Sequence, residues 1–356
     1  MAGKVTLKDI AREVGLSPTA VSLVLNDRPC KISAESRRRI KEVARRKRYI
    51  PNQIARSLVT QHSQTLGLVV PNIESRFFSS FARSLERGCR ERGYALFITS
   101  SDDSATNDSE LVRLLANRGA DGLFVVASDE PTADRALAST LSSLPMPYVM
   151  VDRLIEDLAC DKVAFNNEEG GYLATSHLLR AGHRRVACIV NASSNTGRRR
   201  LDGYLRALAE WGVEPDPGLV FVSAYYIADA YATSEALLAT DATAVFASSD
   251  NIALGLLKRL YERGLRVPRD YSVVSYDNSA ADVLFEPALT SIEQNVDELA
   301  AAALEILFRR LSEEGSGELG APVERVLEPR LVIKDSVRAA RAPFFSPGEQ
   351  RGVRIQ

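Results

Sequence analysis

The 356-residue chain has no long apolar run and few of the residues that build metal or disulfide sites. No stretch approaches the roughly 18 consecutive apolar residues of a transmembrane helix, so we expect no membrane span. The N-terminus also lacks the apolar core of a signal peptide. These absences predict a cytoplasmic protein and argue against a secreted ligand-binding component of a transporter.

The four cysteines and three histidines are too scattered for a metal site. No Cys-x-x-Cys pair occurs, and isolated cysteines in a long chain are typical of buried free thiols. The histidines form no ligand-like cluster. We therefore predict free cysteines, no bound metal and no cofactor. The residues concerned are Cys30, Cys89, Cys160, Cys188, His62, His177 and His183.

Motifs of the common catalytic folds are also missing. No nucleophile elbow, Walker loop or Gly-x-Gly-x-x-Gly follows a predicted strand. Asp250 and Asp277 do follow predicted strands, and paired carboxylates are the apparatus of glycoside hydrolysis. A cytosolic sugar-binding or sugar-processing protein is therefore the alternative from another class, while the missing motifs favour a protein that is not an enzyme.

What the chain does have is a division of charge. Residues 1–62 carry 14 Lys and Arg against 5 Asp and Glu, a net charge of +9, and the remainder carries 31 against 41, a net of −10. Such asymmetry is typical of a basic part that meets a polyanion. A solvated basic face is the alternative, but the helical motif that carries the charge favours DNA binding.

That motif is a pair of short helices. The first is predicted to begin at Thr6, which can form a capping box with Asp9, and to end at Gly15. The second follows at once, with Ser17 as N-cap and Pro18 in its first turn. So tight a turn predicts a helix-turn-helix whose second helix can enter the major groove. Its outward residues are Ser17, Pro18, Thr19, Ser22, Leu23 and Asn26.

A third helix is predicted after Ser33, with Ile40, Val43 and Ala44 inward. Eight cations surround that apolar stripe: Arg37, Arg38, Arg39, Lys41, Arg45, Arg46, Lys47 and Arg48. So many charges on one helix need phosphate partners or open solvent. The first two helices alone could be a structural hairpin, but with these cations they favour a DNA-binding headpiece of residues 1–50.

Three segments resemble a known family. Val5 to Ala11, Ser17 to Asn26 and Tyr49 to Leu58 are similar to the headpiece and hinge of the lactose/galactose repressor (LacI/GalR) family. The resemblance continues through most of the chain. It implies that Thr6 and the outward residues of the second helix contact operator DNA.

The resemblance also implies a hinge helix and linker in residues 51–62. In the family, this helix places an alanine and a leucine in the minor groove. Here the matching helix starts at Asn52, and the matching residues are Ala55 and Leu58. A helix of seven residues is well below the ~12 to 15 needed to persist alone in water. We therefore expect the hinge to fold only on DNA, where Leu58 can act as a wedge that kinks the duplex.

From Gln64 onward, short apolar runs alternate with amphipathic stretches, which predicts α/β lobes with parallel strands. The first series of strands is 66–70, 94–98, 122–126 and 148–151; the second is 163–165, 186–190, 219–222, 244–247 and 272–275. A helix is expected at 296–310 and a last strand near 326–333. The resemblance implies a periplasmic-binding-protein-like core of two doubly wound α/β lobes, between which the chain crosses three times.

The predicted core spans residues 63–338. Its N-lobe takes about 63–163 and 295–322, and its C-lobe about 164–294 and 323–338. Residues 339–356 are expected to be a disordered tail; they contain no leucine heptad, so this tail cannot form a tetramer-making coiled coil. A twofold-symmetric dimer is the expected assembly.

In open α/β sheets ligands bind beyond the carboxyl ends of the strands, and the polar residues there predict a cleft. The resemblance implies that Arg200 and Asp277 grip the effector and that aromatic residues pack over it. A guanidinium fork and a carboxylate suit vicinal hydroxyls. The predicted effector residues are Phe77, Phe78, Asp152, Arg153, Asn195, Thr196, Arg200, Tyr225, Asp250 and Asp277.

The sequence departs from the purine-binding members of the family. Ser194 stands where they have a contacting arginine, and Arg153 where they have a tryptophan, which favours a sugar or sugar derivative. If Arg153 faces the cleft, Arg153 and Arg200 together are expected to favour an acidic or phosphorylated sugar. The chain is thus predicted to be a dimeric, effector-controlled repressor of a pseudo-palindromic operator, with a co-repressor-dependent or activating member as the alternative within regulation.

Overall fold

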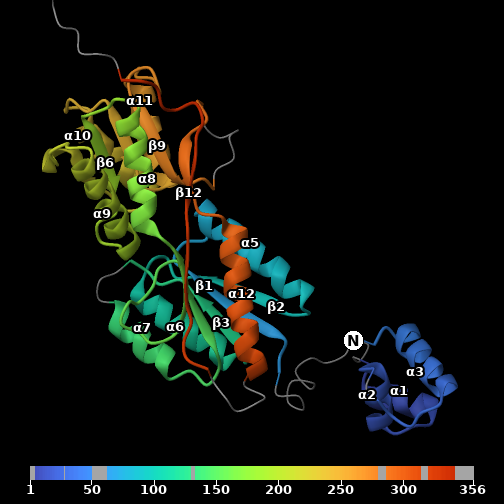
Figure 1. The fold of residues 1–356 in the computed structure, drawn as a ribbon. Coiled ribbons are helices and arrows are strands. Elements are labelled where there is room, and N and C mark those ends of the chain that lie inside the picture. The colour runs from blue at the N-terminus through green and yellow to red at the C-terminus, as the bar shows by residue number, and fades with distance from the viewer. Residues whose placement is uncertain are drawn as a thin grey trace, which may run out of the picture. The chain divides into compact units, whose positions relative to one another are not determined.

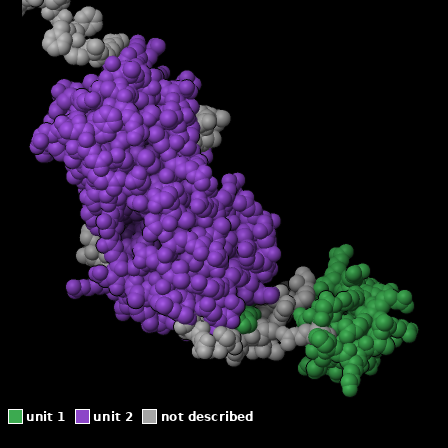
Figure 2. Space-filling view, in the orientation of Figure 1, with its two compact units in different colours: residues 1–63 green, residues 64–356 purple. Residues whose placement is uncertain are grey.

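A computed structural model describes residues 5–27, 29–49, 62–129, 133–279, 286–313 and 320–340. The chain divides into two compact units, Met1–Ser63 and Gln64–Gln356 (Figure 2). The hinge predicted for residues 51–62 lies outside the described residues except for His62, so Asn52, Ala55 and Leu58 cannot be placed. The tail beyond residue 340 also lies outside them.

In its described residues, the first unit contains three helices around one small core. They are α1 (Leu7–Val14), α2 (Pro18–Leu25) and α3 (Ala34–Arg46) (Figure 1). The apolar stripes predicted for the three helices meet in this core, where Ile10, Val21 and Ile40 are fully buried. The predicted helix-turn-helix is therefore confirmed as a fold.

Local hydrogen bonds fix the ends of these helices as the sequence predicts. The Asp9 carboxylate accepts hydrogen bonds from the amide and hydroxyl of Thr6, at 2.9 and 2.7 Å. Ser17 Oγ accepts from the amide of Ala20 at 3.1 Å and so caps α2. Gly15 ends α1 at a φ of 72°, a left-handed conformation that a Cβ would strain. The turn between α1 and α2 is therefore set by local sequence.

The second unit holds two six-stranded sheets. The first has the strand order β11-β5-β4-β3-β1-β2, with parallel pairing throughout. Its strands are β1 (Thr65–Val70), β2 (Ala95–Ser100), β3 (Gly122–Val125), β4 (Tyr148–Val151), β5 (Asp161–Phe165) and β11 (Glu324–Leu327). Helices α5 (Arg76–Glu91) and α12 (Val296–Glu313) cover one face, and α6 (Ala105–Asn117) and α7 (Ala133–Ser142) the other (Figure 1).

The second sheet has the order β12-β10-β9-β8-β6-β7, and β12 is antiparallel to β10. Its strands are β6 (Val186–Val190), β7 (Val220–Val222), β8 (Ala244–Ala247), β9 (Ser272–Asp277), β10 (Thr290–Glu293) and β12 (Arg330–Val332), with a 3₁₀ turn η1 (Pro217–Leu219) before β7. Helices α8 (Asn167–Arg180) and α9 (Asn195–Glu210) pack on one face, and α10 (Ile227–Leu237) and α11 (Asp250–Glu262) on the other. The two predicted α/β lobes are confirmed.

The chain crosses between the lobes three times, but two crossings lie elsewhere than predicted. Strand β5 pairs with β4 and β11 in the first sheet, whereas the sequence assigned residues 163–165 to the second lobe. The single strand expected near 326–333 is in fact two strands in different sheets, β11 and β12. The first lobe therefore extends to residue 165 and again to residue 327, instead of ending at 163 and 322.

Among the described residues, no helix is long and apolar enough to cross a bilayer. In the same residues, no group of His, Cys, Asp and Glu side chains is arranged to hold a metal ion. The four cysteines are free thiols, as predicted. Three of them are buried, while Cys30 in the headpiece is half-buried.

Candidate functional site

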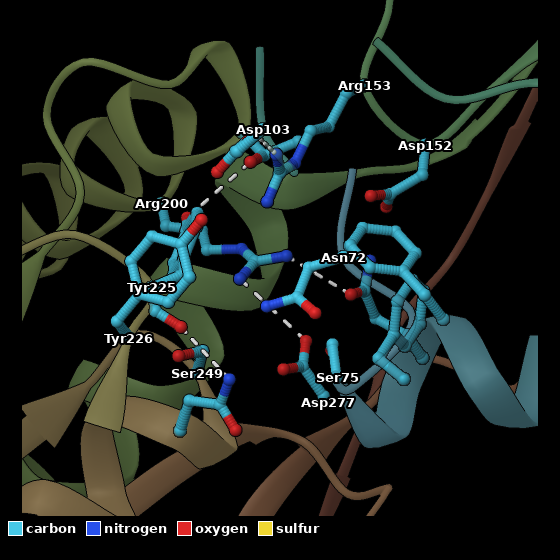
Figure 3. Close-up of a pocket in the computed structure, with 15 residues that line it drawn as sticks. Asn72, Ser75, Asp103, Asp152, Arg153, Arg200, Tyr225, Tyr226, Ser249 and Asp277 are labelled. Atoms are coloured by element: carbon cyan, nitrogen blue, oxygen red, sulfur yellow. Dashed lines mark hydrogen bonds and ion pairs between the residues drawn. The ribbon is translucent and has the colours of Figure 1, made fainter. Parts of the chain in front are cut away.

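The carboxyl ends of the strands of both lobes face a shared cleft (Figure 3). The cleft encloses a cavity of about 40 Å³. Figure 3 shows Asp103 and Arg153 together on one side, Asp277 on the opposite side and Arg200 reaching between them. The lining residues are Asn72, Ser75, Phe77, Phe78, Asp103, Asp152, Arg153, Thr196, Arg200, Tyr225, Tyr226, Ser249, Asn251, Asp277 and Gln294.

The cleft brings together eight of the ten residues predicted for the effector site: Phe77, Phe78, Asp152, Arg153, Thr196, Arg200, Tyr225 and Asp277. The other two do not line this cavity. Asn195 lines a neighbouring groove and donates a long hydrogen bond, 3.4 Å, to the carbonyl of Leu154. The Asp250 carboxylate instead accepts from Ser275 Oγ at 2.6 Å and from the amide of Ser279 at 2.8 Å. The Asp250 oxygens thus hold the loop after β9 in this structure, and the assignment of Asp250 to the effector site stays a prediction.

Arg200 is buried in α9 and is held by groups of its own lobe, including Gln294 at the end of β10. Its Nε donates to Asn167 Oδ1 at 2.8 Å, and one Nη donates to the carbonyl of Ser248 at 2.6 Å. The other Nη donates to Gln294 Oε1 at 3.1 Å. The guanidinium also lies 3.7 Å from the ring centroid of Tyr276. The fork is thus held rigidly at the cleft.

Close packing of α8 against α9 sets the position of Arg200. A Cβ added at Gly171 of α8 would lie 2.0 Å from the carbonyl oxygen of Arg200. One added at Gly203 of α9 would lie 2.0 Å from the carbonyl oxygen of Glu168. Only glycine at these positions allows the two backbones to approach so closely, so these glycines place the guanidinium at the depth where it reaches the cleft.

Arg153, also buried, forms the centre of an ion-pair cluster. One Nη lies 2.9 Å from Asp103 Oδ1 and 3.0 Å from Asp129 Oδ2. Its guanidinium lies 5.3 Å and 5.4 Å from the ring centroids of Phe78 and Tyr225. Burial alone opposes the charge of Arg153, yet Asp129 and Asp103 raise its pKa overall. Arg153 therefore stays charged with two carboxylates beside it.

Several carboxylates of the cleft follow strands in a left-handed backbone conformation. Asp103 has a φ of 57°, Asp152 of 62° and Asp277 of 85°. Residues other than glycine adopt such angles at a cost, and they cluster at functional sites. Burial raises the pKa of Asp277 to about 7, against the lowering effect of Arg200, whose Nη is 3.8 Å away. Burial likewise raises the pKa of Asp152.

Two buried polar atoms in the lining have no hydrogen-bond partner among the described residues. They are Asp152 Oδ1, an acceptor from the first lobe, and Gln294 Nε2, a donor at the end of β10. A buried polar atom without a partner costs roughly 1 to 3 kcal/mol. Their position in the lining makes them candidate contacts for a ligand that offers both a donor and an acceptor.

Seven lining residues are not among the ten predicted effector residues: Asn72, Ser75, Asp103, Tyr226, Ser249, Asn251 and Gln294. The strand-end rule does point to Asn72, which follows β1, and Asp103 lies three residues beyond the end of β2. Gln294 follows β10, whose sequence Thr-Ser-Ile-Glu has too few apolar residues to be recognised as a buried strand.

In the headpiece, the residues predicted to contact DNA are the exposed Thr6, which caps α1, and residues along α2 from its N-cap Ser17 to its C-cap Asn26. Ser17, Pro18 and Thr19 are exposed, while Ser22, Leu23 and Asn26 are half-buried. Asn26 Nδ2 donates to the carbonyl of Ser22 at 2.8 Å, so it also ends α2. The N-terminal end of α2 is therefore the part most open to a partner.

Half of the eight cations of the third-helix region are already paired within the headpiece. Arg37 donates to the carbonyl of Cys30 at 2.9 Å, Lys41 pairs with Asp27 at 2.6 Å, and Arg46 and Lys47 both pair with Glu13. In the described part of the headpiece, Arg38, Arg39, Arg45 and Arg48 have no such partner. These four are the better candidates for phosphate contacts.

Comparison with known proteins identifies the family of this chain. A model for bacterial regulatory proteins of the lacI family matches residues 6–52, and a periplasmic binding protein-like domain model matches residues 175–337. The HTH-type transcriptional repressor PurR of Pasteurella multocida (strain Pm70) is 31% identical over 337 residues, which cover 94% of this chain and 99% of that protein. The chain belongs to the LacI family of bacterial regulatory proteins.

Solved structures of LacI-family regulators are similar as well. The transcriptional regulator CelR in complex with cellobiose is 29% identical, with a TM-score of 0.69, covering 93% of this chain and 99% of that one. A LacI family regulator from Enterococcus faecium with bound ribose is 27% identical, with a TM-score of 0.68, covering 78% of this chain and 100% of that one. The predicted family is confirmed, and with it a ligand-responsive, DNA-binding transcriptional regulator.

Proposed function

We propose that this LacI-family protein is a repressor that binds a pseudo-palindromic operator as a homodimer and is controlled by a sugar or sugar derivative in the cleft. The proposal rests on the hydrogen-bond donors and acceptors that line the cleft. Arg200 and Asp277 lie 3.8 Å apart, and Asp152 and Gln294 line the same cavity, with Asp152 Oδ1 and Gln294 Nε2 lacking hydrogen-bond partners among the described residues. A ring with several hydroxyl groups offers donors and acceptors to all four.

The size of the cavity supports control by movement of the lobes. Typical ligand pockets measure roughly 300 to 1,000 Å³, whereas this cavity measures about 40 Å³. An effector can therefore bind only if the lobes part or side chains such as Arg153 move. A ligand that binds one lobe arrangement better than the other shifts the equilibrium between them, and through it operator affinity.

A purine is the second candidate effector, because the relatives in the comparison are named PurR. The arrangement of the aromatic residues in the cleft argues against a purine effector. A purine needs open ring faces for stacking, but the Arg153 guanidinium lies between Phe78 and Tyr225. Phe77 and Phe78 meet edge to face, with 70° between their planes, and so form no parallel slot. CelR and the Enterococcus regulator, in contrast, carry sugars.

A thermal-shift screen of the full chain tests the effector class. The panel holds neutral sugars including cellobiose and ribose, sugar phosphates, sugar acids and purine bases. A ligand at 100 times its dissociation constant stabilises the folded state by about 2.7 kcal/mol. We expect a sugar to raise the melting temperature; stabilisation by purines alone would overturn the sugar assignment and leave the repressor assignment standing.

For the operator, the proposal assigns base contacts to the N-terminal end of α2. Thr19 is exposed there, and Leu23 offers an apolar contact for thymine methyl groups. The four unpaired arginines of α3 and its end supply phosphate contacts. Residues 51–62 are proposed to fold as the hinge when two copies meet in the minor groove, with Leu58 as the wedge.

The homodimer is proposed to cover apolar side chains on the edges of the sheets. Phe97 and Ile98 lie on β2, an edge strand of the first sheet, and are 52% and 42% exposed. Val222 lies at the end of β7, an edge strand of the second sheet, and is 60% exposed. Exposed apolar edge strands favour self-association unless a partner covers them.

The enzyme alternative loses its main support in the structure. It required Asp250 and Asp277 to act as a pair on a sugar, but the Asp250 carboxylate is bonded to Ser275 and Ser279 and does not line the cavity. Measured turnover of a bound sugar, abolished by Asp250→Ala, would restore that alternative. Whether the effector releases the operator or strengthens binding to it decides between an inducer-controlled repressor and a co-repressor-dependent or activating protein.

A further inference from the structure

The charges around the cleft bear on the kind of effector, and this inference rests on the proposed function. Four carboxylates stand at or behind its wall: Asp103, Asp129, Asp152 and Asp277. Two cations, Arg153 and Arg200, face them. Buried Asp250 adds a further carboxylate beside Asp277, whose Oδ2 lies 3.4 Å from the amide of Asp250. The acidic groups therefore outnumber the basic ones, although the sequence alone draws attention to the two arginines.

Both carboxylates beside Arg153 are themselves held in place. The amide of Asp129 donates to Asp103 Oδ1 at 3.1 Å, and Asn191 Nδ2 donates to Asp129 Oδ2 at 3.1 Å. One residue earlier, the amide of Ser128 donates to the buried Asp108 carboxylate at 2.8 Å. The two acids thus form a built wall around the guanidinium and are not mobile surface groups.

Arg200 is already engaged by its own lobe. Three of its five N–H groups, one on Nε and one on each Nη, donate to Asn167, Ser248 and Gln294. The carboxyl group of Asp277 lies 3.8 Å from one Nη, and burial raises its pKa to about 7, so it carries a partial negative charge at neutral pH. A phosphate or carboxylate on the effector would have only the two remaining N–H groups and would lie beside carboxyl groups, which like-charge repulsion opposes.

We propose that the cleft selects an effector without negative charge, and that Asp103 and Asp129 determine this selectivity by occupying the Arg153 guanidinium. Free, Arg153 is a fork suited to phosphate or carboxylate. Paired through one Nη with two acids, its charge is balanced locally and that Nη is already engaged, so the fork is less available to an anion. The expectation that Arg153 and Arg200 together favour an acidic or phosphorylated sugar is therefore replaced by its opposite.

The first arm of the test compares ligands that differ in charge. Thermal shift and titration calorimetry on the full chain use matched pairs: ribose with ribose 5-phosphate, glucose with glucose 6-phosphate and with glucuronate, and guanosine with guanosine monophosphate. We expect the neutral member of a binding pair to bind at least tenfold tighter. An anionic member that binds as well as its neutral partner would overturn the proposal. If only the purine pair binds, the sugar assignment is wrong. The affinities of the two purine ligands then still show whether the cleft prefers the uncharged one.

The second arm needs no identified effector, because inorganic phosphate is the probe. Asp103→Asn combined with Asp129→Asn keeps the shape of both side chains and leaves Arg153 unpaired. We expect phosphate to raise the melting temperature of this variant by several degrees more than that of the wild type. Asp102→Asn, on the same loop but exposed, is the matched control and is expected to respond as the wild type does.

If the double variant does not fold, Asp103→Asn alone frees one side of the guanidinium and is expected to show a smaller gain. An equal phosphate response in the wild type and the folded variants contradicts the proposal, because Arg153 would then be free in the native cleft or inaccessible in both.

Discussion

Asn191 of the second lobe donates a 3.1 Å hydrogen bond to Asp129 of the first lobe, and Asp129 is also an ion-pair partner of Arg153 in the effector cleft. One carboxylate thus belongs both to the contact between the lobes and to the wall of the ligand site. Whatever changes Arg153 or Asp129 also changes a contact that holds the lobes together. This gives the effector a direct route to the lobe arrangement.

Asn191→Asp tests that contact. A second carboxylate beside Asp129 replaces a donor with a like charge and is expected to lower the free energy of unfolding by about 1 to 3 kcal/mol at pH 8. Burial raises the pKa of Asp129 to about 6, with Arg153 opposing the shift. The folded state therefore binds protons more readily than the unfolded chain, so the loss should shrink as the pH falls through 6.

Urea denaturation of both proteins at pH 8 and pH 5.5 measures the effect. Asn295→Asp is the control, because its side chain only accepts hydrogen bonds from the amides of Asp297 and Glu298. Equal destabilisation by Asn191→Asp at both pH values would show that Asp129 does not sense the new carboxylate.

Leu23→Arg should change the operator that the headpiece prefers. Leucine reads thymine methyl groups by apolar contact, whereas arginine donates two hydrogen bonds to guanine, a difference of roughly 1 to 3 kcal/mol per base pair. Selection of bound sequences from a random pool measures the preference. Identical half-sites for both proteins would remove Leu23 from the base-reading surface. Lys8→Arg, on exposed α1 surface, is expected to leave the half-site unchanged.

Leu58→Ala should weaken binding to the specific operator strongly and binding to random duplex little. The wedge contributes only where the hinge folds between base steps, while non-specific binding depends on counterion release by Lys and Arg. Fluorescence anisotropy on both duplexes at two salt concentrations distinguishes the two contributions. An equal loss on both would make Leu58 a passive linker residue.

Phe97→Asp should dissociate the proposed dimer. It places a charge on the apolar edge strand β2, where a contact between two copies would bury it. Val326→Asp is the matched control: Val326 is 56% exposed on β11, the opposite edge strand of the same sheet. Sedimentation velocity should give a monomer for the first variant and a dimer for the second. Dimers of both variants would place the interface elsewhere.

The sequence predicted those parts of the fold that depend on local pattern. The caps at Thr6 and Ser17 and the apolar runs of β1, β3 and β6 are local signals, and each element is present. Sheet membership is not local. Strand β5 pairs with β11, more than 150 residues away, and no residue within it shows which lobe it joins. Pro329, between β11 and β12, was a usable signal, because proline cannot donate within a strand.

In the site, too, the residues that follow locally recognisable strands were predictable. Asp152, Arg153 and Asp277 follow recognisable strands, so the strand-end rule found them. What Arg153 does was not predictable, since its charge is cancelled by Asp103 and Asp129 from two other strand ends. Gln294, whose Nε2 has no partner among the described residues, was not predictable in this way. It follows β10, and the sequence of β10 is too polar to be recognised as a strand.

A ligand in the cleft is expected to control operator binding through Arg200. The most direct measurement is operator affinity by fluorescence anisotropy, with and without the ligand found in the screen, for the wild type, Arg200→Lys and the control Arg199→Lys. Lysine keeps the charge but loses the fork that bonds Asn167, Ser248 and Gln294. Arg199, exposed one position earlier on α9, pairs only with Glu156 at 3.3 Å in the described residues.

We expect the ligand to change operator affinity at least tenfold in the wild type and in Arg199→Lys. In Arg200→Lys the ligand should have no effect, while affinity without ligand stays within a few-fold of the wild type. A full ligand response in Arg200→Lys, or loss of operator binding by that variant without ligand, would contradict control through Arg200.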